Sequence, residues 1–377
     1  MELDRNHSPM QEPSHKAAVT VLGLESSCDE TAAALVRLSD SGDIEILSDC
    51  IFSQTEQHAP FGGVVPEIAA RAHADIMDKM VKQALIEAKV SWSDIDGIAA
   101  TTGPGLIGGV LVGMMTAKAL AIGTDLPFLS INHLEGHALS PQLAAPLDFP
   151  YLLLLVSGGH TQLLAVESLG IYHRYGSTID DAVGEAFDKT AKIMDLGFPG
   201  GPAIEKIAKP GNKNRFELPR PLAKREGCDF SFAGLKSAVQ RHWQLMECPS
   251  EQDKADLAAS FQQAACDTLI RQSQKAIYRF AEQFGATTLV VAGGVAANQT
   301  VRSGLQVLAE KNQFDFLAPP LRYCTDNGAM IALAGAMRLA NGMVSSLDIA
   351  ARPRWPLDER SAIDNPASGS GKKGPKS

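Results

Sequence analysis

The sequence predicts an α/β protein of two duplicated lobes with a ligand cleft between them. Residues 18–24 form an apolar, β-branched run, followed by a polar turn and by a second apolar run over 31–38. The same succession of strand, turn and strand recurs over 151–156 and 162–166, about 130 residues later. Two matching units indicate an internal duplication, and 377 residues suffice for two lobes of roughly 150 residues each.

The composition excludes several classes of protein. Lys and Arg number 34 against 43 Asp and Glu, and the net charge of −9 argues against a protein that coats DNA or RNA. A nucleic-acid partner would need a local basic patch. The six cysteines show no C-x-x-C spacing, which disfavours a disulfide scaffold or a zinc ribbon and favours a reducing compartment.

Both ends of the chain are polar and are predicted to be disordered. Residues 1–17 lack the apolar core of a signal peptide and are predicted to form a disordered leader. The Gly, Ser and Lys content of residues 358–377 predicts a disordered tail. No run approaches the roughly 20 apolar residues of a membrane span, so we expect a soluble cytoplasmic protein.

Three turns of small residues are candidate phosphate sites. The first, at 25–30, holds hydroxyl and acidic residues that could aim backbone N–H groups at a phosphate and hold a cation. An ordinary hairpin with a polar tip is the alternative, but the second turn at 157–161 repeats the pattern. The third, at 293–294, follows a predicted strand and precedes a predicted helix over 299–311, whose N-terminus would favour an anion.

The segment 101–121 combines a glycine-proline turn with a helix. Small residues recur every four positions along that helix, at Gly109, Gly113, Ala117 and Ala121, which predicts a flat face for close packing. The front of the segment could equally shape a loop over a ligand. It lacks the Lys-Ser/Thr ending of a P-loop, so a phosphate site there is weakly supported.

Two histidines four residues apart, His133 and His137, form a candidate metal site. On a helix this spacing places both imidazoles on one face, one turn apart. Asp326 is available as a third ligand. It precedes a predicted apolar helix over 329–339, so capping that helix is its alternative role.

The segment 178–196 is predicted to be a helix with Asp181, Glu185 and Asp188 on one face. Ion pairs with lysines four residues on would make this a solvated surface. Alternatively, Asp188 accepts a hydrogen bond from a ligand hydroxyl. The Gly- and Pro-rich residues 197–202 are predicted to form an irregular loop suited to wrapping a ligand.

Residues 205–241 form the one locally basic segment. Nine Lys or Arg against four Asp or Glu give it a charge of +5. With Phe216, Phe230 and Phe232 it could grip a phosphate backbone and stack on an unpaired base. A solvated loop with packing aromatics is an equal alternative.

Taken together, these pieces resemble the tRNA threonylcarbamoyladenosine transferase family, once described as O-sialoglycoprotein endopeptidases. The resemblance runs from about residue 19 to residue 357. The motifs that carry it are GLESSCDETAAALV, GGVVPEIAARAH, GPGLIGGVLVG, NHLEGHALSP, LLLVSGGHTQL, IDDAVGEAFDKTAK, GFPGGP, DFSFAGLK, VAGGVAANQTVR and CTDNGAMIA. Small departures, such as Ser26 where the family commonly has Thr, lie outside the positions that carry ligands.

The resemblance implies an actin-like, sugar-kinase-like ATPase fold. The N-terminal lobe would span residues 18–134, with a C-terminal helix at 328–356 packing back on it. The C-terminal lobe would span residues 135–327. The ligand would lie in the cleft between them, in agreement with the duplicated hairpins.

The resemblance also implies the residues of the site. His133, His137 and Asp326 would bind one metal ion, usually Fe(II), with Zn or Mg as possible substitutes in vitro. Asp29 and Glu30 align with residues linked to phosphate handling and catalysis. Contacts to a bound nucleotide, threonylcarbamoyl-adenylate or ATP, would come from Leu155, Val156, Ser157, Gly158, Gly159, Asp188, Gly201 and Asn298.

The implied reaction transfers a threonylcarbamoyl group from threonylcarbamoyl-adenylate to the exocyclic amine of the adenosine 3′ of the anticodon, in tRNAs that read ANN codons. AMP is a good leaving group, so Cys28 is more readily a packing residue than a nucleophile. The implied partners are tRNA, a TsaB-like paralogue, a TsaE-like small ATPase and an upstream synthase of the adenylate.

Two alternatives belong to other classes of protein. A metallo-endopeptidase of glycoproteins would use Glu135 between the histidines, but H-E-x-x-H places its glutamate directly after the first histidine, where this chain has Leu134. A non-catalytic nucleotide-binding regulator would have no need of the three predicted metal ligands. A sugar kinase is less favoured, because metal ligands occupy the cleft.

Overall fold

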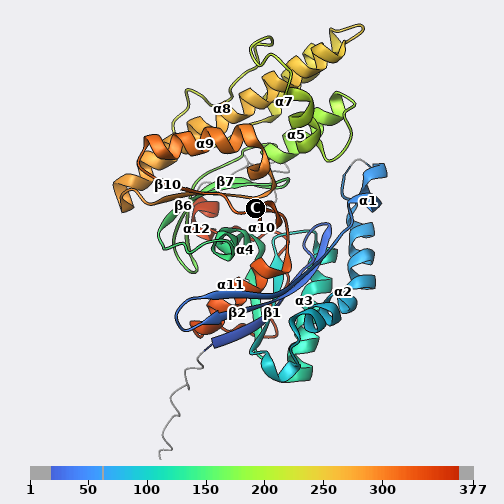
Figure 1. Cartoon of the computed structure of the whole chain (residues 1–377), viewed down its shortest axis with the longest axis vertical. Coiled ribbons are helices and arrows are strands. Elements are labelled where there is room, and N and C mark those ends of the chain that lie inside the picture. The colour runs from blue at the N-terminus through green and yellow to red at the C-terminus, as the bar shows by residue number, and fades with distance from the viewer. Residues whose placement is uncertain (1–17, 62, 365–377) are drawn as a thin grey trace, which may run out of the picture.

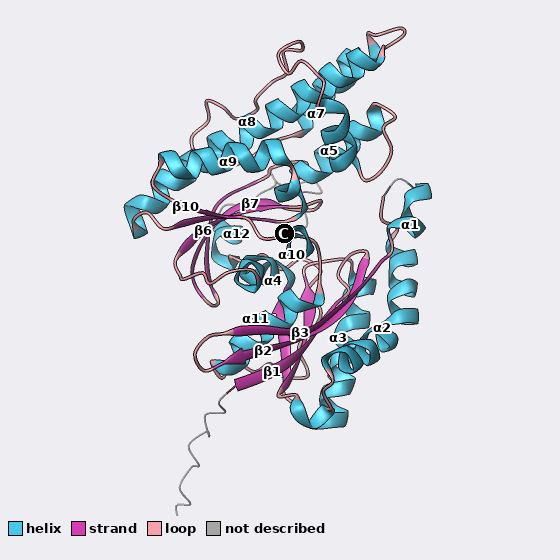
Figure 2. Cartoon of the chain, viewed as in Figure 1, coloured by secondary structure: helices cyan, strands magenta, loops and turns pink. Residues whose placement is uncertain are grey.

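The computed structural model describes residues 18–61 and 63–364, which form two mixed sheets with helices packed around them (Figures 1 and 2). The leader predicted at 1–17 lies outside the described residues. The first sheet contains β1 (Ala18–Glu25), β2 (Glu30–Ser39), β3 (Ile44–Ser53), β4 (Gly97–Gly103) and β5 (Phe128–Asn132). The second contains β6 (Tyr151–Val156), β7 (Thr161–Ser168), β8 (Ile171–Ser177), β9 (Thr288–Ala292) and β10 (Asp315–Leu317).

The two sheets have the same topology. The first runs in the order β3-β2-β1-β4-β5 and the second in the order β8-β7-β6-β9-β10. In each, the first three strands form an antiparallel meander, and the last two add in parallel beside the first strand. This correspondence confirms the duplication that the two hairpins predicted, and with it the two-lobed α/β fold.

Helices pack on both sheets, and the pattern of buried residues shows which faces they cover. The helices are α1 (Thr55–His58), α2 (Pro66–Ala88), α3 (Ile107–Thr124), α4 (His133–Leu139), α5 (Val183–Ile193), α6 (Gly200–Ala208), α7 (Ala233–Gln244), α8 (Glu251–Phe284), α9 (Gln299–Lys311), α10 (Leu321–Cys324), α11 (Gly328–Ala340) and α12 (Glu359–Asp364). Helices α2 and α3 cover one face of the first sheet and α11 covers the other. The upper helices α5 to α9 share a core with the second sheet, whose other face receives α4.

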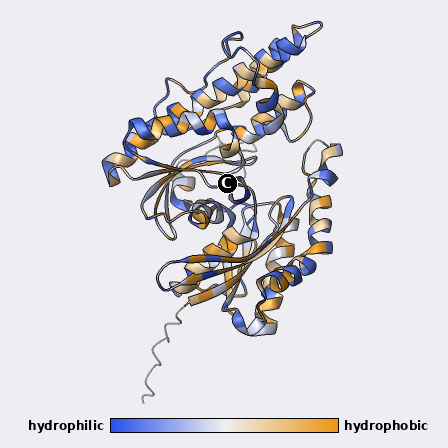
Figure 3. Cartoon of the chain, viewed as in Figure 1, coloured by the Kyte–Doolittle hydropathy of each residue, from blue (hydrophilic) through white to orange (hydrophobic). Residues whose placement is uncertain are grey.

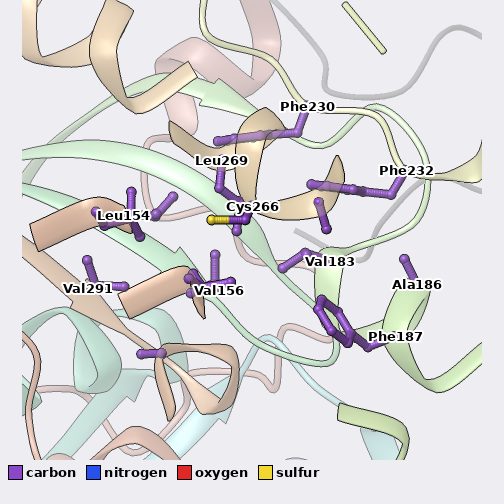
Figure 4. Close-up of a cluster of buried hydrophobic side chains, with 14 of the residues drawn as sticks. Leu154, Val156, Val183, Ala186, Phe187, Phe230, Phe232, Cys266, Leu269 and Val291 are labelled. Atoms are coloured by element: carbon purple, nitrogen blue, oxygen red, sulfur yellow. The ribbon is translucent and has the colours of Figure 1, made fainter. Parts of the chain in front are cut away.

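The core beneath the upper helices is made of aliphatic and aromatic side chains from both sheet and helices (Figure 4). Phe230 and Phe232 lie in it, fully buried and stacked with ring centroids 6.2 Å apart. Stacking of these two rings on an RNA base, one reading of the basic segment, is therefore wrong. Their side chains stabilise the lobe instead, by about 1.5–3 kcal/mol each for burial of a large apolar side chain.

Helix α3 packs through the small residues that its sequence predicted. A Cβ added at Gly109 would lie 2.2 Å from the Ser26 carbonyl oxygen, and one at Gly113 would lie 2.4 Å from Ser26 Oγ. By length and composition, α3 is the one helix of the described residues that could cross a membrane, with 18 residues and a mean hydropathy of 1.5. Its close contacts with the first hairpin are those of a packed core helix, and Figure 3 shows hydrophobic residues along the strands as well.

Four predicted elements differ from the structure. The helix predicted over 178–196 begins only at Val183, so Asp181 does not share its face with Asp188. The predicted loop 197–202 already turns into α6 at Gly200. The helix expected over 328–356 ends at Ala340, two residues before Gly342 adopts a positive φ of 71°.

The fourth difference lies at the C-terminal end of the described chain. Residues 359–364 form α12 where a disordered tail was expected over 358–377. The rest of that predicted tail, residues 365–377, lies outside the described residues. Asp358 accepts a hydrogen bond from the Arg174 backbone N–H at 2.8 Å, and the Arg174 guanidinium donates to the Ser361 carbonyl at 2.8 Å. These contacts with β8 hold the segment in place, and composition alone does not reveal them.

Candidate functional site

A cluster of potential metal ligands lies where α4 meets the segment between α10 and α11, between the two sheets (Figure 1). His133 and His137 project from α4, and their ring centroids lie 4.6 Å apart. Asp326 Oδ1 lies 3.0 Å from His137 Nε2 and 3.5 Å from His133 Nε2. Among the described residues, this is the one group of three or more such side chains whose ligand atoms all lie within 4.8 Å of one another.

The separations fit one metal ion. Two ligand atoms that each lie about 2.1 Å from an ion are about 3.0–3.4 Å apart in octahedral or tetrahedral geometry. Asp326 Oδ1 lies 3.0 Å from His137 Nε2, within that range, and 3.5 Å from His133 Nε2, just beyond it. The donor set of two imidazoles and one carboxylate suits Fe(II) or Zn and leaves positions open for a substrate.

Capping residues on two neighbouring helices place the ligands. Asn132 ends β5, and its side-chain oxygen accepts a hydrogen bond from the Leu134 N–H, which starts α4 at His133. Asn327 accepts from the Met330 N–H and caps α11. The alternative role of Asp326 as the cap of this helix is therefore wrong, and its carboxylate faces the histidines.

A buried glutamate fixes the orientation of His133. Glu25, fully buried at the end of β1, lies with its Oε2 3.0 Å from His133 Nδ1 and accepts a hydrogen bond from Thr101 Oγ1 at 2.6 Å. Its Oε1 accepts from the Ser27 N–H at 2.6 Å. This arrangement keeps a proton on Nδ1 and turns Nε2 of His133 toward Asp326. Metal-binding histidines commonly donate their other ring N–H to a carboxylate in this way.

His133 and the carboxylates of Glu25 and Asp326 stabilise one another in their charged forms. Burial alone would favour the neutral forms, but Asp326 and Glu25 raise the pKa of His133 to about 9. Burial likewise opposes ionisation of Glu25, and the charge and hydrogen bond of His133 outweigh it and lower the pKa of Glu25. Without a metal ion, His133 is therefore a cation between two carboxylates, and metal binding must displace its proton.

Glu25→Gln should weaken Co²⁺ binding about tenfold, because a neutral amide no longer stabilises the Nδ1 proton of His133. The measurement is a Co²⁺ titration in competition with a chelator. Glu45→Gln is the matched control, since Glu45 is an exposed residue of β3 paired with Arg37. Equal affinities in the two variants would refute a supporting role for Glu25.

The first turn places Cys28, Asp29 and Glu30 beside this site. Burial, together with the charges of Asp326 and Asp29, raises the pKa of Glu30 to about 10. Burial also raises the pKa of the Cys28 thiol well above its ordinary value, which disfavours the thiolate and agrees with a packing role. His73, which motif reasoning did not assign, is buried with Nε2 3.1 Å from the Cys28 carbonyl and Nδ1 2.7 Å from Thr31 Oγ1.

The second turn, at 157–161, is held by hydrogen bonds between its own residues, and the backbone of its glycines is accessible. The Ser157 N–H donates to the His160 carbonyl at 2.8 Å, and the His160 N–H donates to Ser157 Oγ at 3.1 Å. A Cβ added at Gly158 or Gly159 would meet no heavy atom of the described chain within 4 Å, so a ligand can approach the backbone there. Leu155 and Val156 are fully buried in β6, where they pair with β7, so neither presents surface to a ligand in this structure.

The remaining predicted nucleotide residues are Asp188 within α5, Gly201 at the start of α6 and Asn298 at the N-cap of α9. Asp188 Oδ1 accepts from the Gly200 N–H at 2.7 Å, at the start of α6 beside Gly201. Asn298 caps α9 and donates from Nδ2 to Gln262 Oε1 at 2.8 Å. Beside Gly201 and Asn298, a groove of about 610 Å³ runs between α6, α8 and the start of α9, lined by Pro202, Glu205, Lys206, Ala208, Lys209, Gly211, Lys213, Ala259, Gln262, Gln263, Ala297, Gln299 and Thr300.

Two arginines of the basic segment (residues 205–241) already form ion pairs within the protein. Arg215 pairs with Asp253 and Asp256 of α8, and Arg220 Nη2 lies 2.7 Å from Asp267 Oδ2. Internal partners therefore occupy part of the +5 charge. Because these aspartates lie about 40 residues or more further along the chain, local charge counting misses them.

The sequence is similar along nearly its whole length to one group of transferases. A family model described as TsaD, tRNA N6-adenosine threonylcarbamoyltransferase, matches residues 45–333. A protein of that name from Maricaulis maris (strain MCS10) is 57% identical over 373 residues, covering 98% of this chain and 99% of its own. The chain belongs to the tRNA N6-adenosine threonylcarbamoyltransferase family. A second member, from Bartonella henselae, is 56% identical and covers 94% of this chain and 99% of its own.

Membership makes the chain an acyltransferase that acts in tRNA modification, as its motifs predicted. The fold agrees with a distant neighbour, the HypF protein of T. kodakarensis. That protein is 16% identical, with a TM-score of 0.57, and covers 88% of this chain and 49% of its own. At this identity the likeness shows the fold alone.

The peptidase alternative is not favoured by the family, and the geometry of Glu135 agrees. A peptidase of the H-E-x-x-H type needs its glutamate free to take a proton from metal-bound water. Here Glu135 is fully buried and receives hydrogen bonds from Tyr172 and Arg338. Nor is a purely regulatory role favoured, because the members of the family named above are transferases.

Proposed function

We propose that His133, His137 and Asp326 bind one divalent metal ion, with Fe(II) as the physiological ion and Zn or Mg as substitutes. The observation that carries the proposal is the convergence of these three side chains, with the orientation of His133 fixed by Glu25. When bound, the metal would orient the acyl donor and polarise one of its oxygens as a Lewis acid. Metal content after anaerobic purification would identify the ion.

We propose threonylcarbamoyl-adenylate as the donor in the transfer. The N6 amine of the adenosine 3′ of the anticodon attacks the carbamoyl carbon, and a C–N bond forms. The bond from that carbon to the phosphate oxygen breaks, and AMP leaves with the electron pair. The turn 157–159, with Asp188, Gly201 and Asn298, would hold the adenylate, because its backbone N–H groups and nearby helix starts suit a phosphate and a nucleoside.

The acidic residues of the first turn are proposed to move the proton. Asp29 would accept the proton that the attacking amine releases. Glu30, whose pKa of about 10 keeps it protonated at neutral pH, would donate a hydrogen bond to an oxygen of the donor. A side-chain nucleophile is unnecessary in this scheme.

The decisive test is a complete reaction. The chain is incubated with threonine, bicarbonate, ATP, an adenylate synthase, a TsaB-like paralogue, a TsaE-like small ATPase and unmodified tRNA that reads ANN codons, all proposed to meet in the cytoplasm. Mass analysis of the digested nucleosides should show threonylcarbamoyladenosine. If none forms although the synthase delivers the adenylate, the proposed donor and acceptor are wrong.

The tRNA is proposed to contact the exposed part of the basic segment. Arg220 is a poor probe because it holds Asp267, whereas Lys224 and Arg225 have exposed side chains. Lys224→Glu with Arg225→Glu should weaken tRNA binding and lower the slope of log affinity against log salt by about one to two. Lys82→Glu on α2 is the control, and an unchanged slope in the double variant would remove the segment from the interface.

A further inference from the structure

Glu135 is a fully buried carboxylate for which the transfer reaction has no evident use. It lies two residues from each histidine of α4, about 160° around the helix axis from both, so it points away from the metal cluster. Arg338 donates from Nε to Oε2 at 2.9 Å and from Nη2 to Oε1 at 3.1 Å. Tyr172 donates its hydroxyl to Oε1 at 2.8 Å.

The partners of Glu135 come from both lobes. Arg338 lies in the last turn of α11, which packs on the first sheet, and Tyr172 lies in β8 of the second sheet. A bidentate pair between guanidinium and carboxylate sets direction as well as distance. The carboxylate therefore fastens α4 to one element of each lobe.

Helix α4 also meets α11 at two separated points. His137 reaches Asp326 just before α11 begins, while Glu135 reaches Arg338 near its end. Between them Gly136 packs closely, since a Cβ there would lie 2.9 Å from Ile331 Cδ1. The contact of Glu135 opposes any rotation of α4 that would carry the imidazoles away from Asp326.

The helix cannot hold this orientation through its own stability. With seven residues it is far shorter than the 12–15 that an isolated helix needs to be even marginally stable. Its apolar side chains Leu134 and Ala138 pack on the second sheet, and Tyr151 donates its hydroxyl to the Ala138 carbonyl at 2.8 Å. Apolar contacts are non-directional, so hydrogen bonds and ion pairs restrain the rotation of α4. The bidentate pair of Glu135 with Arg338 adds to the Asn132 cap and to the contact of His133 with Glu25.

We propose that Glu135 is a positioning residue that, through Arg338 and Tyr172, fixes the rotation of α4 and so the geometry of the metal ligands. It touches neither substrate nor metal. The inference rests on the proposed metal site of His133, His137 and Asp326. Its consequence is that metal affinity depends on contacts with both lobes on the far side of α4.

Glu135→Gln in the full chain tests the proposal, with Co²⁺ as the probe because its visible absorption bands report ligand geometry. The amide keeps the size and one hydrogen-bond acceptor but loses the ion pair. We expect Co²⁺ affinity to fall about tenfold and the bands to shift. Asp256→Asn is the matched control, because it removes a buried carboxylate of α8, paired with Arg215 and away from α4. The Co²⁺ affinity and absorption bands of this variant should equal those of the wild type.

Two further variants keep the test decisive if Glu135→Gln folds poorly. Tyr172→Phe removes one hydrogen bond and should cause a smaller change in the same direction. Arg338→Met, alone and combined with Glu135→Gln, gives a double-mutant cycle, and the combined loss of affinity should be less than the product of the single losses.

Wild-type bands and affinity in folded Glu135 and Tyr172 variants would overturn the inference while leaving the metal site intact. Failure of the wild-type chain itself to bind Co²⁺ would overturn both the metal site and the inference.

Discussion

Asp326→Ala is expected to abolish metal binding and to lower threonylcarbamoyl transfer at least about a hundredfold, while the chain stays folded. Asp326 is the ligand that faces both histidines, at 3.0 and 3.5 Å from their Nε2 atoms. Without it, only the two imidazoles remain, and a site with two protein ligands and no carboxylate binds a divalent ion weakly. The fold should survive because Asn327, the neighbouring residue, caps α11. Co²⁺ titration and nucleoside mass analysis measure the two effects.

A control variant that removes a different carboxylate separates the loss of metal binding from a general effect of removing one negative charge. Asp315→Ala changes an exposed residue of β10 and should leave both metal binding and transfer unchanged. Circular dichroism and thermal unfolding would confirm that both variants fold. Undiminished transfer by metal-free Asp326→Ala would show that the reaction needs no metal at this site.

Gly184→Ala is expected to weaken binding of the adenylate, and of AMP as its analogue, by about 10- to 100-fold. A Cβ on Gly184 would lie 2.5 Å from the Ser157 carbonyl oxygen, 2.8 Å from its carbon and 2.9 Å from Gly158 Cα. These are backbone atoms of the second turn, so the turn itself must move. A displacement near 1 Å in such a site can cost about a hundredfold in rate.

Calorimetry with AMP and the transfer assay would measure the effect. Gly123→Ala, in the last turns of α3 with no heavy atom of the described chain within 4 Å of its added Cβ, is the matched control. There the substitution should leave binding unchanged and add up to about 1 kcal/mol of stability through helix propensity. Wild-type affinity for AMP in Gly184→Ala would exclude the second turn from the nucleotide site.

Local sequence pattern was sufficient for the hairpins and for the common face of the two histidines. An apolar run, a turn of small residues and a returning run define β1 with β2 and β6 with β7, because strand pairing across a short turn is a local matter. The spacing of His133 and His137 likewise sets their common face through helix geometry. The duplicated sheet order followed from the repetition of these local units.

The groups that support the ligands were beyond local pattern. Glu25 is 108 residues from His133, and Arg338 is 203 residues from Glu135. Glu25 ends an otherwise apolar strand, and this position indicates a buried carboxylate that needs a partner. The sequence pattern does not show which residue that partner is. The internal partners of the basic segment were missed for the same reason, because the aspartates that pair with Arg215 and Arg220 lie on α8. Its contact with tRNA stays a prediction.

The sequence by itself determined the two-lobed α/β duplication and, through its motifs, the family, because periodicity, turns and motif spacing act over a few residues. That His133, His137 and Asp326 bind the metal stays a prediction. The tertiary structure alone decided that Asn327 and not Asp326 caps α11, that Phe230 and Phe232 are core residues, and that Glu135 faces away from the metal cluster. Those outcomes depend on which side chains, distant in the sequence, come into contact when the two lobes pack. A buried charge is stable only beside a partner that offsets the free-energy cost of its desolvation.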